Sequence, residues 1–158
     1  MRHLIIVASA AALLGCAKAD KPADTPAAAP AATPAPVPPP PGITLADVAG
    51  KWNVVGKNET GDSTLVNYVF TATPDSSHWT MTFPGRPAVP VHVVSVAGDS
   101  IEIAAGPYSS VLRKGVQVKT HGSLRMQGGK LVGTTRAHYS VKTADSVRVL
   151  KTEGTRAP

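Results

Sequence analysis

The feature that most constrains this chain is an unbroken alternation of apolar and polar residues from Val116 to Gln127. A period of two over such a length is typical of a β-strand with one face on a core and the other in water. Gly128-Gly129 follows, and two glycines readily adopt the positive φ angles of a two-residue hairpin turn. Lys130 to Tyr139 then return with the same alternation, and a slip by one residue would bury the charged row. The predicted register sets three pairs face to face: Val118 and Tyr139, Leu124 and Gly133, and Met126 and Leu131.

Shorter strands are expected around this hairpin, because apolar alternation recurs between clusters of Gly, Pro, Asp and Ser. Only one helical turn is expected, near Ile43–Asp47. The further strands are predicted at residues 52–57, 64–72, 77–83, 89–96, 101–105, 108–112 and 145–153. The pattern predicts an all-β fold: a single small antiparallel up-and-down β-barrel of eight or nine strands, in which closure removes exposed strand edges.

Loop lengths predict how these strands face one another. A four-residue loop at 73–76 pairs Phe70 with Trp79 and Tyr68 with Met81. Large apolar side chains of both strands then share one face. We expect that face to form one wall of the barrel interior.

The Gly98-Asp99 turn suits a type II′ hairpin, since glycine takes the positive φ angle at its first position. This turn pairs Val94 with Ile103. It also turns His92 inward opposite Ala105, unless a bulge at the proline of that strand resets the register.

Gly106-Pro107 is expected to form a corner or turn between residues 101–105 and 108–112. Arg113-Lys114-Gly115 then forms a three-residue hairpin loop, with glycine at the position that favours a left-handed backbone. This loop places Ser110 opposite Val118.

The first 15 residues have the organisation of a lipoprotein signal peptide. Met1-Arg2-His3 is basic, and Leu4–Leu14 is an apolar run too short to span a bilayer. The run ends in Leu13-Leu14-Gly15-Cys16, which resembles the lipobox of bacterial lipoproteins. The resemblance implies cleavage before Cys16, diacylation of its sulfur and acylation of its nitrogen; an ordinary secretory signal is the alternative. Cys16 is the only cysteine, so no intramolecular disulfide competes for it.

Residues 16–42 are expected to form the lipidated cysteine and a Pro/Ala-rich linker. Nine prolines among alanines, with no apolar periodicity, cannot bury a core and favour extended polyproline II. A proline-rich signalling ligand is the alternative. Ala17, and not aspartate, follows the cysteine, and the resemblance to lipoproteins then implies an outer-membrane lipid anchor, with the domain in the periplasm or at the cell surface. The barrel domain is predicted at residues 43–158.

Charge is uneven along the predicted barrel. Residues 43–106 hold three basic and six acidic side chains, whereas residues 107–158 hold ten and two. The outward row of the central hairpin gathers basic groups in one patch, for which an anionic glycan or lipid is the predicted partner and plain solvation the alternative. The patch comprises Lys119, His121, Arg125, Arg136 and His138. Nucleic acid is not an expected partner, because an exported protein with few aromatic residues offers little base stacking.

Gly50-Lys51-Trp52, at the start of the first strand, resembles the Gly-x-Trp signature of lipocalins. In that family the tryptophan closes one end of the barrel and stacks under an arginine of the last strand. The resemblance implies this role for Trp52, with Arg148 as the first candidate partner and Arg156 as the second, through a cation–π contact. The domain is shorter than a full lipocalin and lacks a clear helix before its last strand, so we expect a lipocalin-like barrel in which the motif is structural.

A second resemblance is to the periplasmic inhibitors of metalloproteases, which are also eight-stranded barrels. Their domain begins with a tetrapeptide similar to Ala49-Gly50-Lys51-Trp52. In those inhibitors the segment before the barrel enters the protease cleft, which implies a role for Pro41–Asp47 here. The chain lacks the cysteine pair of the inhibitors, so the resemblance is one of architecture.

Catalysis is not expected, and neither is a metal or another cofactor. The histidines of the domain, at 78, 92, 121 and 138, have no i, i+2 or i, i+4 spacing, and no cysteine is left to join them. The chain has no Gly-x-Ser-x-Gly elbow, no phosphate-binding glycine loop and no pair of carboxylates on a shared inward face. The sequence therefore predicts a binding or structural protein and not an enzyme.

The inward row of the central hairpin is made of small residues, such as Gly122 and Ala137, and faces the wall of large ones. Either the large side chains fill the barrel, or a cavity is left for an apolar ligand. The predicted ligand-binding residues are Tyr68, Phe70, Trp79, Met81, Phe83 and His92. Binding of an apolar small molecule or envelope component is the first functional expectation, protease inhibition the second, and a structural role without a pocket the third.

Overall fold

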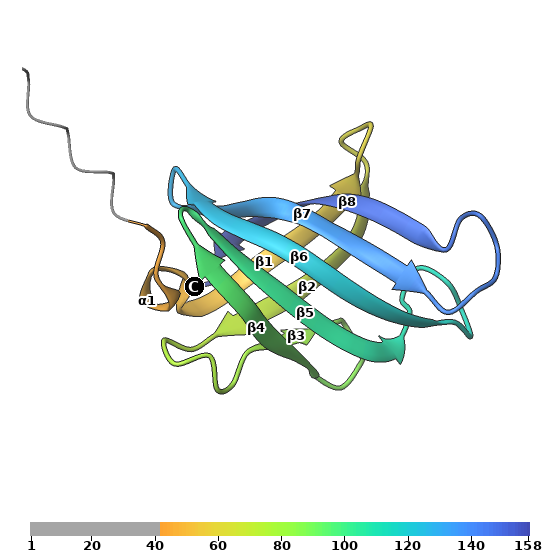
Figure 1. Ribbon diagram of the computed structural model, residues 1–158, viewed down its shortest axis with the longest axis horizontal. Helices are drawn as coiled ribbons and strands as arrows, with labels where there is room; N and C mark the ends of the chain where they lie inside the picture. The colour runs from red at the N-terminus through yellow and green to blue at the C-terminus, as the bar shows by residue number, and fades with distance from the viewer. Residues whose placement is uncertain (1–41) are drawn as a thin grey trace, which may run out of the picture. The chain divides into compact units, whose positions relative to one another are not determined.

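The computed structural model describes residues 42–158, so the predicted signal peptide, Cys16 and nearly all of the linker lie outside the described residues. The elements are α1 (Leu45–Val48), β1 (Gly50–Asn58), β2 (Thr64–Ala72), β3 (Thr80–Thr82), β4 (Val89–Ala97), β5 (Ser100–Ser109), β6 (Gln117–Gln127), β7 (Lys130–Tyr139) and β8 (Val147–Arg156). The strands form a closed antiparallel barrel in chain order, with β8 paired to β1 (Figure 1). The predicted all-β up-and-down barrel is therefore confirmed, with eight strands. No helix within residues 42–158 has the length and apolar character needed to cross a membrane.

The β6–β7 hairpin has the predicted register over its whole length. Val118 lies opposite Tyr139, and Met126 lies opposite Leu131. Gly128 and Gly129 have φ angles of 57° and 74°, which is the backbone that a two-residue turn of this kind requires. The register is fixed because one face of the hairpin is buried and the other carries the charged row.

β5 is a single strand where two were predicted. A bulge between Ala105 and Tyr108 absorbs Gly106-Pro107 inside the strand. Tyr108 consequently lies opposite Val118, the position predicted for Ser110. The Ser110 hydroxyl instead accepts hydrogen bonds from two amides of the following loop, so the chain leaves the sheet there. The predicted pairing of Ser110 with Val118 is wrong, because the bulge lets the strand continue past Gly106-Pro107.

The register of β2 and β3 differs from the prediction by two residues. Phe70 lies opposite Met81, so the predicted pairs Phe70–Trp79 and Tyr68–Met81 are wrong. Residues 73–79 form a longer loop than expected, and the Trp79 indole donates a hydrogen bond of 2.7 Å to the first carbonyl of this loop. A shift of two keeps each side chain on its predicted face, so the aromatic wall still faces the interior.

A bulge in β4 turns His92 outward. Val93 lies opposite Ile103, and Val94 is the extra residue, with 64% of its surface exposed. An extra residue in a strand reverses the face of the sheet to which the preceding side chains point. His92 therefore lies opposite Ala104, and its side chain is exposed. The predicted inward His92 and the predicted pair of Val94 with Ile103 are therefore wrong. The bulge lies at Val94 and not at the proline of this strand.

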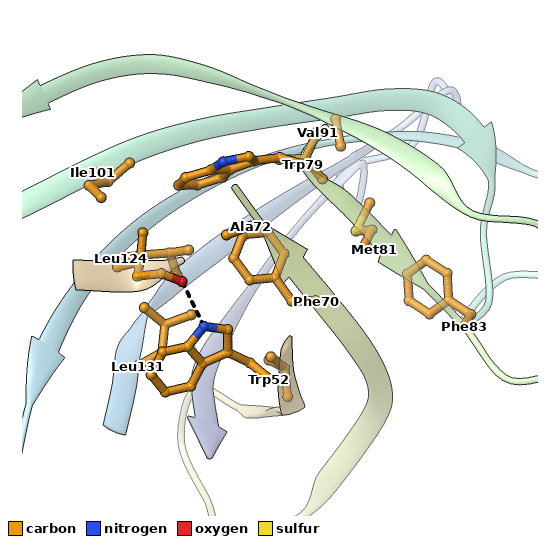
Figure 2. Packing of buried hydrophobic residues seen from close by; sticks show 13 residues of the cluster. Trp52, Phe70, Ala72, Trp79, Met81, Phe83, Val91, Ile101, Leu124 and Leu131 are labelled. Carbon is orange, nitrogen blue, oxygen red and sulfur yellow. Dashed lines mark hydrogen bonds between the residues drawn. The ribbon is translucent and has the colours of Figure 1, made fainter. Parts of the chain in front are cut away.

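Trp52 closes the α1 end of the barrel and is fully buried. Its indole donates a hydrogen bond of 2.8 Å to the carbonyl of Val48 (Figure 2). The guanidinium of Arg156 lies 4.4 Å from the ring centre and donates to the main-chain carbonyls of residues 47 and 49. Arg148, the first candidate for this stack, is exposed and lies opposite Ala137, well away from Trp52 along β8. The second candidate makes the contact because β8 continues to Arg156, beyond its predicted end.

Large side chains fill the barrel next to Trp52. Phe70 meets Trp79 edge to face, with ring centres 5.5 Å apart. Ile101, Leu124 and Leu131 belong to the same buried cluster, and Figure 2 shows them around these rings. This half of the interior is packed as a hydrophobic core.

Candidate functional site

A cavity of about 50 Å³ lies in the half of the barrel away from Trp52. One wall is formed by four of the predicted ligand-binding residues, Tyr68, Phe70, Met81 and Phe83. The opposite wall is formed by small residues of the central hairpin, Thr120, Gly122, Thr135 and Ala137. The structure thus brings the two predicted walls together. Trp79 and His92 do not line the cavity, because Trp79 packs in the filled half and His92 lies on the outer surface.

Three tyrosines, Tyr68, Tyr108 and Tyr139, line the cavity. Phe83 stacks on Tyr108 with ring centres 5.7 Å apart, and its ring centre lies 5.4 Å from that of Tyr68. Burial raises the pKa of the Tyr68 and Tyr108 hydroxyls, and the Thr120 hydroxyl partly offsets the rise for Tyr108. Both hydroxyls stay neutral and able to donate a hydrogen bond. Sequence reasoning missed Tyr108 because of the β5 bulge, and missed Tyr139 although the hairpin register turned it inward.

Residues 110–116, which we name the lid, connect β5 and β6, and the first three of them line the cavity. The Ser110 hydroxyl holds the start of the lid by accepting hydrogen bonds of 3.0 and 3.1 Å from two lid amides. Val111 packs against the core, and both Val111 and Leu112 line the cavity. Arg86 donates a hydrogen bond of 2.8 Å to the carbonyl of residue 109, at the base of the lid.

Arg113 connects the lid to the loop between β7 and β8. Its guanidinium lies 4.3 Å from the ring centre of Tyr139 and 2.6 Å from the Asp145 carboxylate. We name the Arg113–Asp145 pair the latch. The Thr143 hydroxyl and the Arg113 charge hold the pKa of the Asp145 carboxyl below its ordinary value. Because the pair is solvent-exposed on its Asp145 side, it restrains the lid only weakly.

The five predicted patch residues lie together on the outer surface of β6 and β7. Lys119 lies opposite His138 and His121 lies opposite Arg136, as predicted. The two imidazole rings meet edge to face, with centres 5.8 Å apart. All five side chains, including Arg125, are exposed, and none takes part in an ion pair within the described part of the chain.

The segment before the barrel is tied to the closed end. The amide of Ile43 donates a hydrogen bond of 2.8 Å to the carbonyl of Gly98, in the β4–β5 turn. Thr44 and Asp47 form a capping box at the start of α1, and Val48 is 1% exposed. Residues 43–48 therefore complete the barrel. Entry into a protease cleft would require this segment to detach.

Between residues 42 and 158, no three His, Asp or Glu side chains gather closely enough to hold a metal ion. No protein-family model, no curated protein and no solved structure matches this chain.

Proposed function

We propose that this protein is a non-catalytic lipoprotein, anchored in the outer membrane through acylated Cys16, whose barrel holds a slender apolar molecule beneath the lid. The observation that supports binding is the uneven filling of the interior. Large side chains pack the half near Trp52, whereas a cavity lies between an aromatic wall and a wall of small residues in the other half. Apolar lining with a few hydroxyl groups is typical of sites that hold small apolar ligands.

The size of the cavity limits the ligand. Its volume of about 50 Å³ is well below the roughly 150 Å³ at which an apolar cavity takes up benzene. A ligand therefore needs Val111 and Leu112 of the lid to move outward. An unbranched acyl or alkyl chain fits this site best, because a narrow molecule needs the least displacement, and a tyrosine hydroxyl can bind a polar group at its end.

Native mass spectrometry of the protein purified from its own membrane tests the proposal directly. We expect a co-purified apolar molecule, and we expect membrane lipid extract to displace an apolar fluorescent dye from the protein. Ala137→Val should lower dye affinity, since it adds volume to the cavity wall. Thr134→Val, an exposed change on the same strand, is the matched control. Absence of both ligand and dye binding would leave a structural barrel with a filled core.

The anchor is tested separately with Cys16→Ser. Each buried methylene of an acyl chain contributes about 0.8 kcal/mol to membrane binding, so three chains anchor far better than one. We expect the variant to be soluble or to retain its signal peptide. A processed Cys16→Ser protein in the membrane fraction would refute lipid anchoring and leave the barrel proposal standing.

A further inference from the structure

We propose that the outer surface of β6, β7 and β8 binds a linear acidic polysaccharide. This surface, which we name the basic face, extends the predicted patch by one strand and includes a groove on the outer wall. Its cationic or titratable residues are Lys119, His121, Arg125, Arg136, His138 and Lys151. The inference is independent of the cavity, because these side chains point away from the interior.

The register arranges the basic face in parallel rows. Lys119 and His138 form one row, and His121 and Arg136 form the next. Lys151 follows on β8, opposite Thr134. Outward residues two apart on a strand are separated by about 6.6–6.8 Å, so the rows from Lys119 to Arg125 extend over about 20 Å. Repeated positive charge along a line is complementary to a polymer that carries an anionic group at regular intervals.

Few acidic groups face these cations. Glu153 of β8 lies in the next row but is engaged by Lys57 of β1. Glu102 of β5 lies opposite Ser123, and no ion pair between it and the basic face is formed in residues 42–158. Asp62 and Glu153 offset part of the positive charge at the groove, but the basic face keeps a net positive charge, and an anionic partner gains from it.

A groove of about 350 Å³ lies at one end of the basic face and distinguishes among anionic partners. Its charged lining comprises the cations Lys57, Arg125 and Lys151 and the carboxylates Asp62 and Glu153, and its polar lining includes Ser123, Thr134 and Gln127. Gly133 also lines it, and a Cβ atom there would clash with the Ser123 carbonyl. A concave surface with hydroxyl and amide groups between two cations suits a hydroxylated chain, whereas a flat bilayer surface would leave these groups without partners.

Nucleic acid is the less favoured polyanion. Both tryptophans are buried inside the barrel, and none of the residues that form the basic face and its groove offers an aromatic platform larger than imidazole. Binding of single strands depends on stacking of bases on aromatic side chains. A saccharide with carboxylates needs only the cations and the hydrogen-bonding groups that are present.

The test uses the full-length protein in detergent, with polygalacturonate as the acidic polymer and dextran as the neutral one. We expect binding to polygalacturonate only, with affinity falling at least about tenfold as salt rises from roughly 50 to 500 mM. Lys119→Ala/Arg136→Ala and Arg125→Ala/Lys151→Ala should each weaken binding by about tenfold or more, because each removes two cations of the basic face.

Lys114→Ala/Lys142→Ala is the matched control, since it removes the same charge from exposed loop positions outside the basic face. We expect less than about a twofold change in this control. An equal loss in all three double variants would overturn the proposal, because net charge alone would then govern binding. Tighter binding to single-stranded DNA than to polygalacturonate would also overturn it.

Discussion

The two ends of the barrel use the same device for opposite purposes. At each end an arginine covers an aromatic ring: Arg156 lies 4.4 Å from the centre of Trp52, and Arg113 lies 4.3 Å from the centre of Tyr139. Arg156 donates to main-chain carbonyls, whereas Arg113 is paired with the carboxylate of Asp145. Carbonyls of a closed barrel are fixed and do not titrate, whereas a loop carboxylate can move and gain a proton. We infer that the Trp52 end is a permanent plug and the Tyr139 end an entrance.

The largest difference between the ends should appear on truncating an aromatic residue at each. Trp52→Ala removes a fully buried indole and its hydrogen bond to Val48, and it should lower the free energy of unfolding by about 3–5 kcal/mol. Tyr108→Ala removes a half-buried ring beside an existing cavity and should cost about 1–2 kcal/mol. Urea unfolding followed by far-ultraviolet circular dichroism measures both. Equal losses of unfolding free energy would show that the barrel is packed as tightly around Tyr108 as around Trp52.

A smaller loss of stability is expected from Arg156→Ala. The guanidinium is exposed but makes two main-chain hydrogen bonds and a cation–π contact, so removal should cost about 1–2 kcal/mol. Arg148→Ala is the matched control, because Arg148 lies on the same strand and its side chain makes no hydrogen bond or cation–π contact among residues 42–158. Both are measured by urea unfolding. A control as destabilised as Arg156→Ala would remove the plug role from Arg156.

The accuracy of sequence reasoning also differed between regions. The β6–β7 register was predictable because a two-residue Gly-Gly turn, together with one charged face, allows only one pairing of the two strands. The facing of His92 was not, because the Val94 bulge reverses every position before it and leaves no clear mark in the sequence. Arg156 was underrated because strand ends are set by barrel closure, which local alternation does not report. The cavity volume depends on side-chain packing, which cannot be predicted from the alternation of apolar and polar residues.

Breaking the latch is expected to have a moderate effect on the rate at which an apolar dye enters the cavity. Arg113→Ala removes the contacts with Tyr139 and Asp145 but leaves the Ser110 hydrogen bonds that shape the lid. We expect an apolar dye to enter several-fold faster, with a smaller loss of stability than in Arg156→Ala, because a surface ion pair contributes little to folding. Stopped-flow fluorescence measures the entry rate. Lys114→Ala, the neighbouring lid residue, is the control and should leave that rate unchanged.

The smallest expected effect is a dependence of dye entry on pH. The pKa of Asp145 lies below its ordinary value of 3.8, first because of the Thr143 hydroxyl and then because of Arg113. A carboxyl whose pKa is lowered by folding stabilises the folded arrangement above its unfolded pKa, and this contribution is lost as the pH falls through the lowered value. The latch should therefore hold at neutral pH and release below about pH 3.8.

Asp145→Asn isolates this effect from the other carboxylates of the barrel. The asparagine side chain does not titrate, so the variant should admit dye at one rate from about pH 3 to about pH 7. The wild-type rate should rise toward that of the variant on acidification. A parallel rise of the dye-entry rate in both proteins would assign the pH dependence to groups other than Asp145, such as Asp47 at the plug. The distinction between a titratable entrance and a fixed plug would then be wrong.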